Sequence, residues 1–115
     1  MKTLLALLLL TLCATPALAQ NQFEMNRQAE ASFAKADAEL NRVYAKVIAT
    51  LDDESKPELK AAQRAWVAFR DAQATFEMNQ EARGGSMAPM IYAGVRATLT
   101  KARIAQLKEL LTNAR

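Results

Sequence analysis

The 115-residue sequence contains no histidine and only one cysteine, Cys13. Histidine is the commonest general base of enzymes, and histidine and cysteine together supply most ligands of zinc and other transition metals. Their scarcity removes histidine acid–base catalysis, thiol nucleophiles and most metal sites from consideration. We therefore expect a protein that is not an enzyme and that holds no cofactor or metal.

Glycine and proline are also scarce, with three of each in the chain. From Phe23 to Lys56 neither residue occurs, and no stretch alternates apolar and polar residues with the period of two that a half-buried strand shows. The only strong break follows Arg83, where the run 84–89 contains two glycines and a proline. The sequence therefore predicts an all-α fold.

The first part of the chain has the features of a secretory signal peptide. Lys2 gives a basic start, residues 4–12 form an apolar run, and Pro16–Ala19 ends in the small–x–small pattern that signal peptidase cuts. We predict a cleaved signal peptide over residues 1–19, a single mature domain over residues 20–115, and a periplasmic or secreted location.

Two alternatives for this segment are a membrane anchor and a lipoprotein. The apolar run is shorter than the ~20 residues that a spanning helix needs. Cys13 lies within the run, whereas a lipidated cysteine would begin the mature chain. Because Cys13 would leave with the signal peptide, the mature domain is expected to have no disulfide and to be stabilised by packing alone.

Charge is nearly balanced, with 15 Lys and Arg against 12 Asp and Glu. Loss of Lys2 with the signal peptide would reduce the small excess further, so we expect no nucleic-acid binding. Residues 84–115 are locally basic, and Lys101, Lys108 and Arg115 recur at every seventh position. A solvated helix face is the leading interpretation of this stripe, with weak contact to an anionic envelope surface as the alternative.

Apolar residues recur at steps of three and four along three segments, which is typical of amphipathic helices. The first helix is expected over residues 24–51, with Phe33, Ala36, Leu40, Val43, Tyr44, Val47 and Leu51 facing the core. The second is expected to start at a capping box formed by Ser55 and Glu58 and to end near Arg83. Its apolar line is Leu59, Ala62, Trp66, Phe69, Gln73 and Phe76.

A third helix follows the glycine loop, with an apolar line at Tyr92, Val95, Leu99, Ile104, Leu107, Leu110 and Leu111. Short connections between the helices favour an antiparallel helical hairpin or three-helix bundle.

Several polar residues fall beside the predicted core. The expected structural polar network comprises Asp37, Asn41, Gln63, Trp66, Arg70 and Arg103. We expect Arg70 to bridge to Asp37 and Asn41 across the first two helices, because a half-buried guanidinium needs a planar acceptor and hydrogen-bond partners.

A series of short motifs follows in order along the mature chain. They are Glu24-Met25-Asn26, Ala36-Asp37-Ala38-Glu39-Leu40-Asn41 with Tyr44, Ala62-Gln63-Arg64-Ala65-Trp66, Phe69-Arg70-Asp71-Ala72, Gly84-Gly85-Ser86, Leu99-Thr100 and Arg103. Together they resemble the LprI-type lysozyme-inhibitor family of small exported helical domains. The resemblance implies a bacterial envelope or periplasmic protein that inhibits lysozyme, or another wall hydrolase, by direct binding. The chain departs from the family pattern at Gln28, Ala74 and Val95, where the family usually has cysteine.

Two turns are the candidate partner-binding segments. The acidic turn, Asp52, Asp53 and Glu54, could meet the basic rim of a lysozyme active site, and the glycine loop, Gly84, Gly85 and Ser86, is narrow enough to enter a cleft. Ordinary connecting turns are the simpler interpretation of both. The alternative to lysozyme inhibition is a cell-envelope structural or interaction module. In that case the basic third helix and the methionines beside the glycine loop, Met87 and Met90, would contact lipid, glycan or a partner protein.

Overall fold

The computed structural model describes the backbone of residues 15–113 and the side chains of residues 17–113. This range contains three helices and no strand, so the predicted all-α fold is confirmed. They are α1 (Thr15–Thr50), α2 (Ser55–Ala82) and α3 (Ala88–Asn113). Most of the predicted signal peptide, residues 1–14, lies outside the described residues, and its cleavage remains a prediction.

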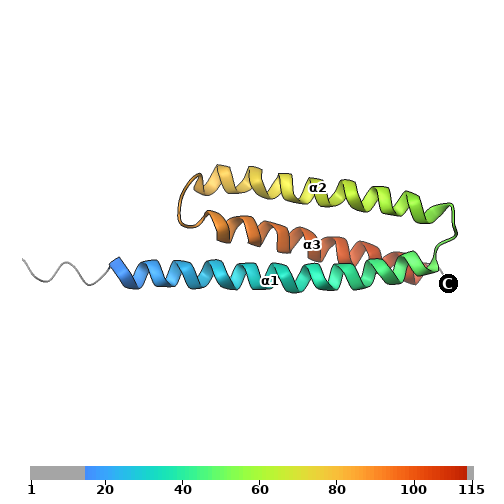
Figure 1. Ribbon diagram of the computed structural model, residues 1–115, viewed down its shortest axis with the longest axis horizontal. Coiled ribbons are helices and arrows are strands. Elements are labelled where there is room, and N and C mark those ends of the chain that lie inside the picture. Colours follow the sequence, from blue (N-terminus) through green and yellow to red (C-terminus); the bar gives the residue numbers. More distant parts are fainter. Residues whose placement is uncertain (1–14, 114–115) are drawn as a thin grey trace, which may run out of the picture.

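The α3 helix is the central element of the fold (Figure 1). It runs parallel to α1 and antiparallel to α2, and it packs along both. The α1 and α2 helices make few direct contacts with each other. The molecule is therefore an antiparallel α1–α2 hairpin whose two arms are held together by the third helix.

The α1 helix begins at Thr15, nine residues before the predicted start at residue 24. Pro16 does not prevent this, because proline is tolerated in the first turn, where backbone N–H groups have no intrahelical partner. No glycine or proline interrupts the helix after that point. The predicted cleavage site after Ala19 therefore lies within the first turns of α1.

The predicted capping box at the start of α2 is wrong. Glu54 occupies the N-cap position and makes no side-chain capping hydrogen bond. Asp52 caps the helix instead. Its Oδ1 accepts a hydrogen bond from the Ser55 backbone N–H at 2.7 Å, and its carbonyl accepts one from the Lys56 N–H at 3.1 Å. An acidic group at this end also interacts favourably with the helix dipole.

The α2 helix ends at Ala82, close to the predicted position. Gly84 has a φ of +69°, a left-handed conformation that glycine adopts without steric cost and that commonly ends helices. Gly85 N–H then donates to the Ala82 carbonyl at 2.9 Å. This turn reverses the chain so that α3 can return between the other two helices.

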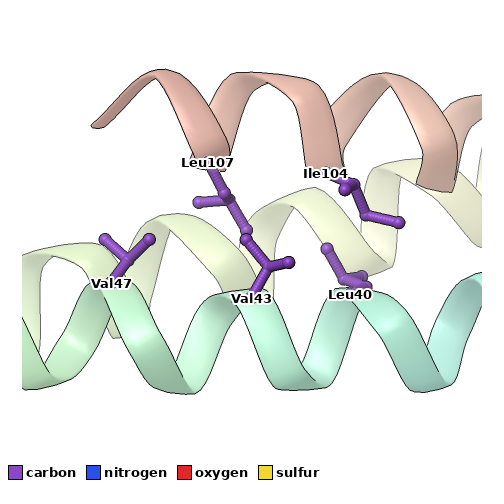
Figure 2. Packing of buried hydrophobic residues seen from close by; sticks show 5 residues of the cluster. All are labelled: Leu40, Val43, Val47, Ile104 and Leu107. Atoms are coloured by element: carbon purple, nitrogen blue, oxygen red, sulfur yellow. The ribbon is translucent and has the colours of Figure 1, made fainter. Parts of the chain in front are cut away.

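Two clusters of buried apolar residues join α1 to α3. The larger contains Leu40, Val43, Val47, Ile104 and Leu107, which interdigitate across the helix pair (Figure 2). The smaller contains Phe33, Ala93 and Ala97. These residues confirm the predicted core face of α1, where Phe33, Ala36, Leu40, Val43 and Val47 are all buried.

Small residues occupy much of the buried face of α3. Ala93 and Thr100 are fully buried and Ala97 is nearly so, whereas the predicted Tyr92, Val95 and Leu99 are only half-buried. Small side chains let helix axes approach closely and leave room for larger groups from the neighbouring helices. In this fold those larger groups are the Phe33 ring of α1 and the Arg70 side chain of α2.

The predicted inward face of α2 is confirmed only in part. Leu59 and Trp66 are partly buried against the larger cluster, but Phe69 and Phe76 point to solvent and are 54% and 57% exposed. The residues that α2 buries most completely are Gln63, Arg70 and Ala74. Polar contacts to the other helices therefore help to set the orientation of α2, and its apolar line does not set it alone.

Candidate functional site

A layer of charged side chains centred on Arg70 joins all three helices. Arg70 is only 4% exposed. Its Nη1 donates to Asp37 Oδ1 on α1 at 3.2 Å, and its Nε donates to Asp71 Oδ1 on α2 at 2.9 Å. Nη1 also lies 3.5 Å from the Thr100 hydroxyl on α3, at the long limit of a hydrogen bond. A planar guanidinium with five N–H donors can serve acceptors in several directions at once.

Asp71 is shared between two arginines. Arg96 Nε donates at 3.0 Å to the same Oδ1 that accepts from Arg70. Burial raises the pKa of Asp71, but the hydrogen bonds and positive charges of Arg70 and Arg96 outweigh it and hold this pKa below that of a free aspartate. The carboxylate is therefore charged at neutral pH and balances part of the arginine charge.

Aromatic rings lie against the guanidinium groups of this layer. The Arg70 Cζ lies 5.0 Å from the Phe33 ring centroid and 5.4 Å from that of Trp66. The Arg96 Cζ lies 3.7 Å from the Phe33 centroid and 4.9 Å from that of Tyr92. A cation within about 6 Å of a ring centroid is attracted by the negative face of the ring. These rings therefore stabilise the partly desolvated arginines.

Arg103 makes a second polar contact between α2 and α3. Its Nε donates to Gln63 Oε1 at 3.0 Å, and its Nη1 donates to Gln106 Oε1 at 3.2 Å. The Arg103 Cζ lies 5.9 Å from the Trp66 ring centroid. Burial lowers the pKa of Arg103. Among residues 17–113 no buried side-chain nitrogen or oxygen lacks a hydrogen-bond partner, so the polar contacts satisfy one another.

The polar network expected from the sequence is only partly reproduced. The structure brings Arg70 to Asp37, but Asn41 is exposed and no hydrogen bond joins it to Arg70. Asn41 lies one turn beyond Asp37 on α1, at the wall of an open groove between α1 and α2. Asp71 and Thr100 are the partners that the sequence analysis did not assign, although Asp71 adjoins Arg70 in one of the family-like motifs.

An open groove of about 340 Å³ lies between α1 and α2 beside this layer. It is lined by Asp37, Leu40, Asn41, Tyr44, Lys60, Gln63, Arg64 and Val67. Its walls combine apolar surface with charges of both signs. The groove therefore does not select one class of small ligand by charge.

The two candidate partner-binding turns lie at opposite ends of α2 (Figure 1). The acidic turn, residues 52–54, precedes this helix, and the glycine loop, residues 84–86, follows it. A helix of 28 residues is ~42 Å long at a rise of 1.5 Å per residue. The structure thus does not bring the two segments together, and one cleft cannot receive both.

Within the acidic turn, the three carboxylates differ in their surroundings. The hydrogen bond from the Ser55 backbone N–H is the main cause that lowers the pKa of Asp52, whose carboxylate is committed to the start of α2. The Asp53 side chain is fully exposed, at 102% of its reference area, and lies 3.6 Å from Lys56 Nζ. Glu54 is exposed as well. Asp53 and Glu54 are therefore the carboxylates that a protein partner can reach.

The glycine loop is exposed but tied to α1. Asn26 Nδ2 donates to the Ser86 carbonyl at 3.0 Å, and Ala88 N–H donates to the Gly85 carbonyl at 3.1 Å. Both contacts use backbone carbonyls of the loop. These two hydrogen bonds restrict the conformation of the glycine loop. A loop held only at its two ends could change shape more freely on entering a cleft.

The basic stripe of α3 is interrupted by an acidic residue of α1. Lys108 Nζ lies 3.1 Å from Glu39 Oε1, and both side chains are about half exposed. Lys101 is exposed, and Arg115 lies outside the described residues. The cations that the structure describes on this stripe are therefore partly neutralised.

Among the residues that the structure describes, no group of three or more His, Cys, Asp or Glu is placed to hold a metal ion. Over that range, no helix combines the length and the apolar character needed to cross a membrane.

Comparisons with known proteins identify relatives of the chain. A family model described as "Lysozyme inhibitor LprI" matches residues 13–107. An uncharacterized protein of Rhizobium meliloti (strain 1021) is 39% identical over an alignment 132 positions long, which covers 95% of this chain and 94% of that protein. No solved structure matches the chain significantly. Because the family match extends over all of α1 and α2 and most of α3, the chain belongs to the lysozyme inhibitor LprI family.

Proposed function

We propose that this protein is an exported inhibitor that binds lysozyme directly and blocks access to its glycan-binding cleft. The observation that carries the proposal is the family match over residues 13–107, which includes both candidate binding turns. The buried polar side chains are all hydrogen-bonded within the described fold, so they are not free to bind a partner. Both candidate turns are exposed and can be reached by a partner.

The acidic turn is the better candidate for contact with lysozyme. Animal lysozymes are strongly basic, and complementary charge speeds association and fixes the orientation of the partners. Asp53 and Glu54 are exposed at the tip of the α1–α2 hairpin, and Asp52 holds the backbone of the turn in place. Since the chain as a whole is slightly basic, attraction to a basic enzyme requires such a local acidic surface.

The test is a turbidity assay in which lysozyme clears a cell-wall suspension in the presence of increasing amounts of the exported protein. We expect slower clearing that saturates near an equimolar ratio. The Asp53→Asn/Glu54→Gln variant keeps the size of both side chains and keeps Asp52, so its fold is expected to be unchanged. It should inhibit at least tenfold less well, and the loss should be greatest at low salt because exposed charges are screened by added ions.

A matched control changes the other end of α2. The Gly85→Ala/Ser86→Ala variant is tolerated by the fold, since a Cβ at Gly85 meets its nearest neighbour, the Ala82 carbonyl oxygen, at an ordinary 3.5 Å. If this variant loses inhibition and the acidic-turn variant does not, the glycine loop is the contacting segment. No slowing at a large excess of the unaltered protein would refute inhibition of the lysozyme tested.

A further inference from the structure

The outward face of α2 has an apolar stripe that no part of the described chain covers. The stripe, hereafter the α2 stripe, consists of Ala62, Ala65, Phe69, Ala72 and Phe76. All five side chains are exposed, and the two phenylalanines are 54% and 57% exposed. The residues follow one another at steps of three and four, the heptad spacing by which one helix packs against another.

The outward direction of the α2 stripe follows from the rotation of α2. The same helix turns Gln63 and Arg70 toward α1 and α3, and their contacts to Arg103, Asp37 and Thr100 fix its rotation. The α2 stripe is therefore held facing outward. Contiguous exposed apolar surface rimmed by polar residues is typical of an interaction site.

We propose that the α2 stripe is the contact surface between two copies of this protein, whose α2 helices pack antiparallel about a twofold axis. In an antiparallel heptad pair the two kinds of core position face each other in each layer. The register that sets Phe69 of one copy opposite Ala72 of the other also sets Phe76 opposite Ala65. Each large ring then meets a small alanine, and by symmetry every such contact occurs twice.

Charged residues at the two ends of the stripe fit the same register. Glu58 lies in the first turn of α2, and Arg83 directly follows its last residue. The register that pairs Phe69 with Ala72 places Glu58 of one copy opposite Arg83 of the other. Within the described chain neither of them makes an ion pair. A parallel pair would instead oppose Glu58 to Glu58 and Phe69 to Phe69.

The face between these charges is uncharged, which favours a helix partner over an anionic surface. The exposed positions that flank the stripe are Ala61, Ala68, Thr75 and Gln80. Alanines let two helix axes approach toward the close end of the usual 8–10 Å range. A single helix pair is smaller than the roughly 800 Å² per partner of a standard interface, so the dimer should form at micromolar concentration or above.

The first experiment measures mass against concentration for the exported protein by analytical ultracentrifugation, from about 1 µM to about 1 mM. We expect a monomer–dimer equilibrium that Ala65→Glu weakens at least tenfold, because the new carboxylate faces Phe76 of the other copy. The matched control is Ala45→Glu, which changes another exposed alanine, on α1 and outside the stripe. It should leave the equilibrium unchanged, and the helical circular dichroism of both variants should match that of the parent.

The second experiment tests the antiparallel register by oxidative crosslinking in a Cys13→Ser background. Two single-cysteine variants, Ala62→Cys and Asn79→Cys, are mixed and oxidised. The proposed register places residue 62 of one copy opposite residue 79 of the other, so the mixed 62–79 disulfide should dominate. Prevalence of 62–62 and 79–79 disulfides would overturn the antiparallel arrangement.

A protein that stays monomeric over the whole concentration range would overturn the proposal. The same holds if Ala65→Glu reduces lysozyme inhibition or binding to anionic vesicles without any change in mass, since the stripe would then serve another partner. The proposal would be supported if the parent protein dimerises and the Ala65→Glu variant, with its dimerisation weakened, still inhibits lysozyme as well as the parent does. The α2 stripe would then be a surface distinct from the acidic turn.

Discussion

Replacement of Arg70 by methionine tests whether the buried polar layer stabilises the fold. Methionine occupies a similar length and keeps apolar contact with Phe33 and Trp66, but it removes the ion pairs to Asp37 and Asp71. Breaking a fully buried ion pair by removal of one partner costs roughly 3–5 kcal/mol. The variant therefore isolates the polar part of the contribution.

The expected cost lies at or below the lower end of that range. The Asp37 and Asp71 side chains are each 40% exposed, so water can solvate the carboxylates left behind. Arg96 also continues to pair with Asp71 at 3.0 Å. We expect a loss of about 2–3 kcal/mol in the free energy of unfolding. For a domain of this size this corresponds to a melting temperature lower by roughly 10–20 °C.

Thermal unfolding followed by circular dichroism at pH 7 measures this difference. The matched control is Arg64→Met, which removes an exposed arginine from the same helix and should cost less than about 0.5 kcal/mol. Arg70→Lys should fall between the two, because it keeps the charge but not the planar fork of donors. An Arg70→Met variant that melts like the Arg64→Met control would refute the proposed contribution of the layer.

The pH dependence of the stability difference between the parent and Arg70→Met gives a second measurement. Because the pKa of Asp71 is lower in the folded protein than in the unfolded chain, its contribution is fully present above the unfolded pKa and is lost as the pH falls through the folded value. The stability difference between the parent and Arg70→Met should therefore be largest near neutral pH and shrink below about pH 4.

Two further predictions concern the core and the absence of disulfides. Leu107 is fully buried in the larger α1–α3 cluster, so Leu107→Ala should lower the free energy of unfolding, measured by chemical denaturation, by about 2–5 kcal/mol. Leu110→Ala, at a position that is 45% exposed, should lower it much less. Equal effects of the two substitutions would contradict the described packing. The exported protein should also melt at the same temperature with and without reductant, since Cys13 is the only cysteine and lies in the predicted signal peptide; a reductant-dependent shift would show that Cys13 is retained and oxidised.

Local sequence features predicted the elements of this fold well. Three segments with apolar residues at steps of three and four became three helices, and the glycine loop after Arg83 became the turn between the last two. Along α1, the residues predicted to face the core are those that α3 buries. These features depend on neighbours within a few residues, which is why pattern and turn chemistry identify them.

The candidate binding turns were predicted on either side of the second helix. Sequence identified the acidic turn and the glycine loop as separate hypotheses, and the motifs around them resembled the family to which the chain belongs. The structure shows one uninterrupted helix of 28 residues between the two turns, so they lie a full helix length apart. The distance excludes joint entry into one cleft, and it makes the two loop variants independent tests.

By itself, the sequence determined that the chain is helical, where its helices break, and which face of α1 is apolar. The tertiary structure decided which face of α2 turns inward. The sequence analysis placed Phe69 and Phe76 in the core and Gln63 and Arg70 beside it, whereas the fold exposes the two phenylalanines and buries the two polar residues. The reason is that Arg70 finds its partners on all three helices, so the free energy of this contact exists only once they are assembled and cannot be inferred from α2 alone.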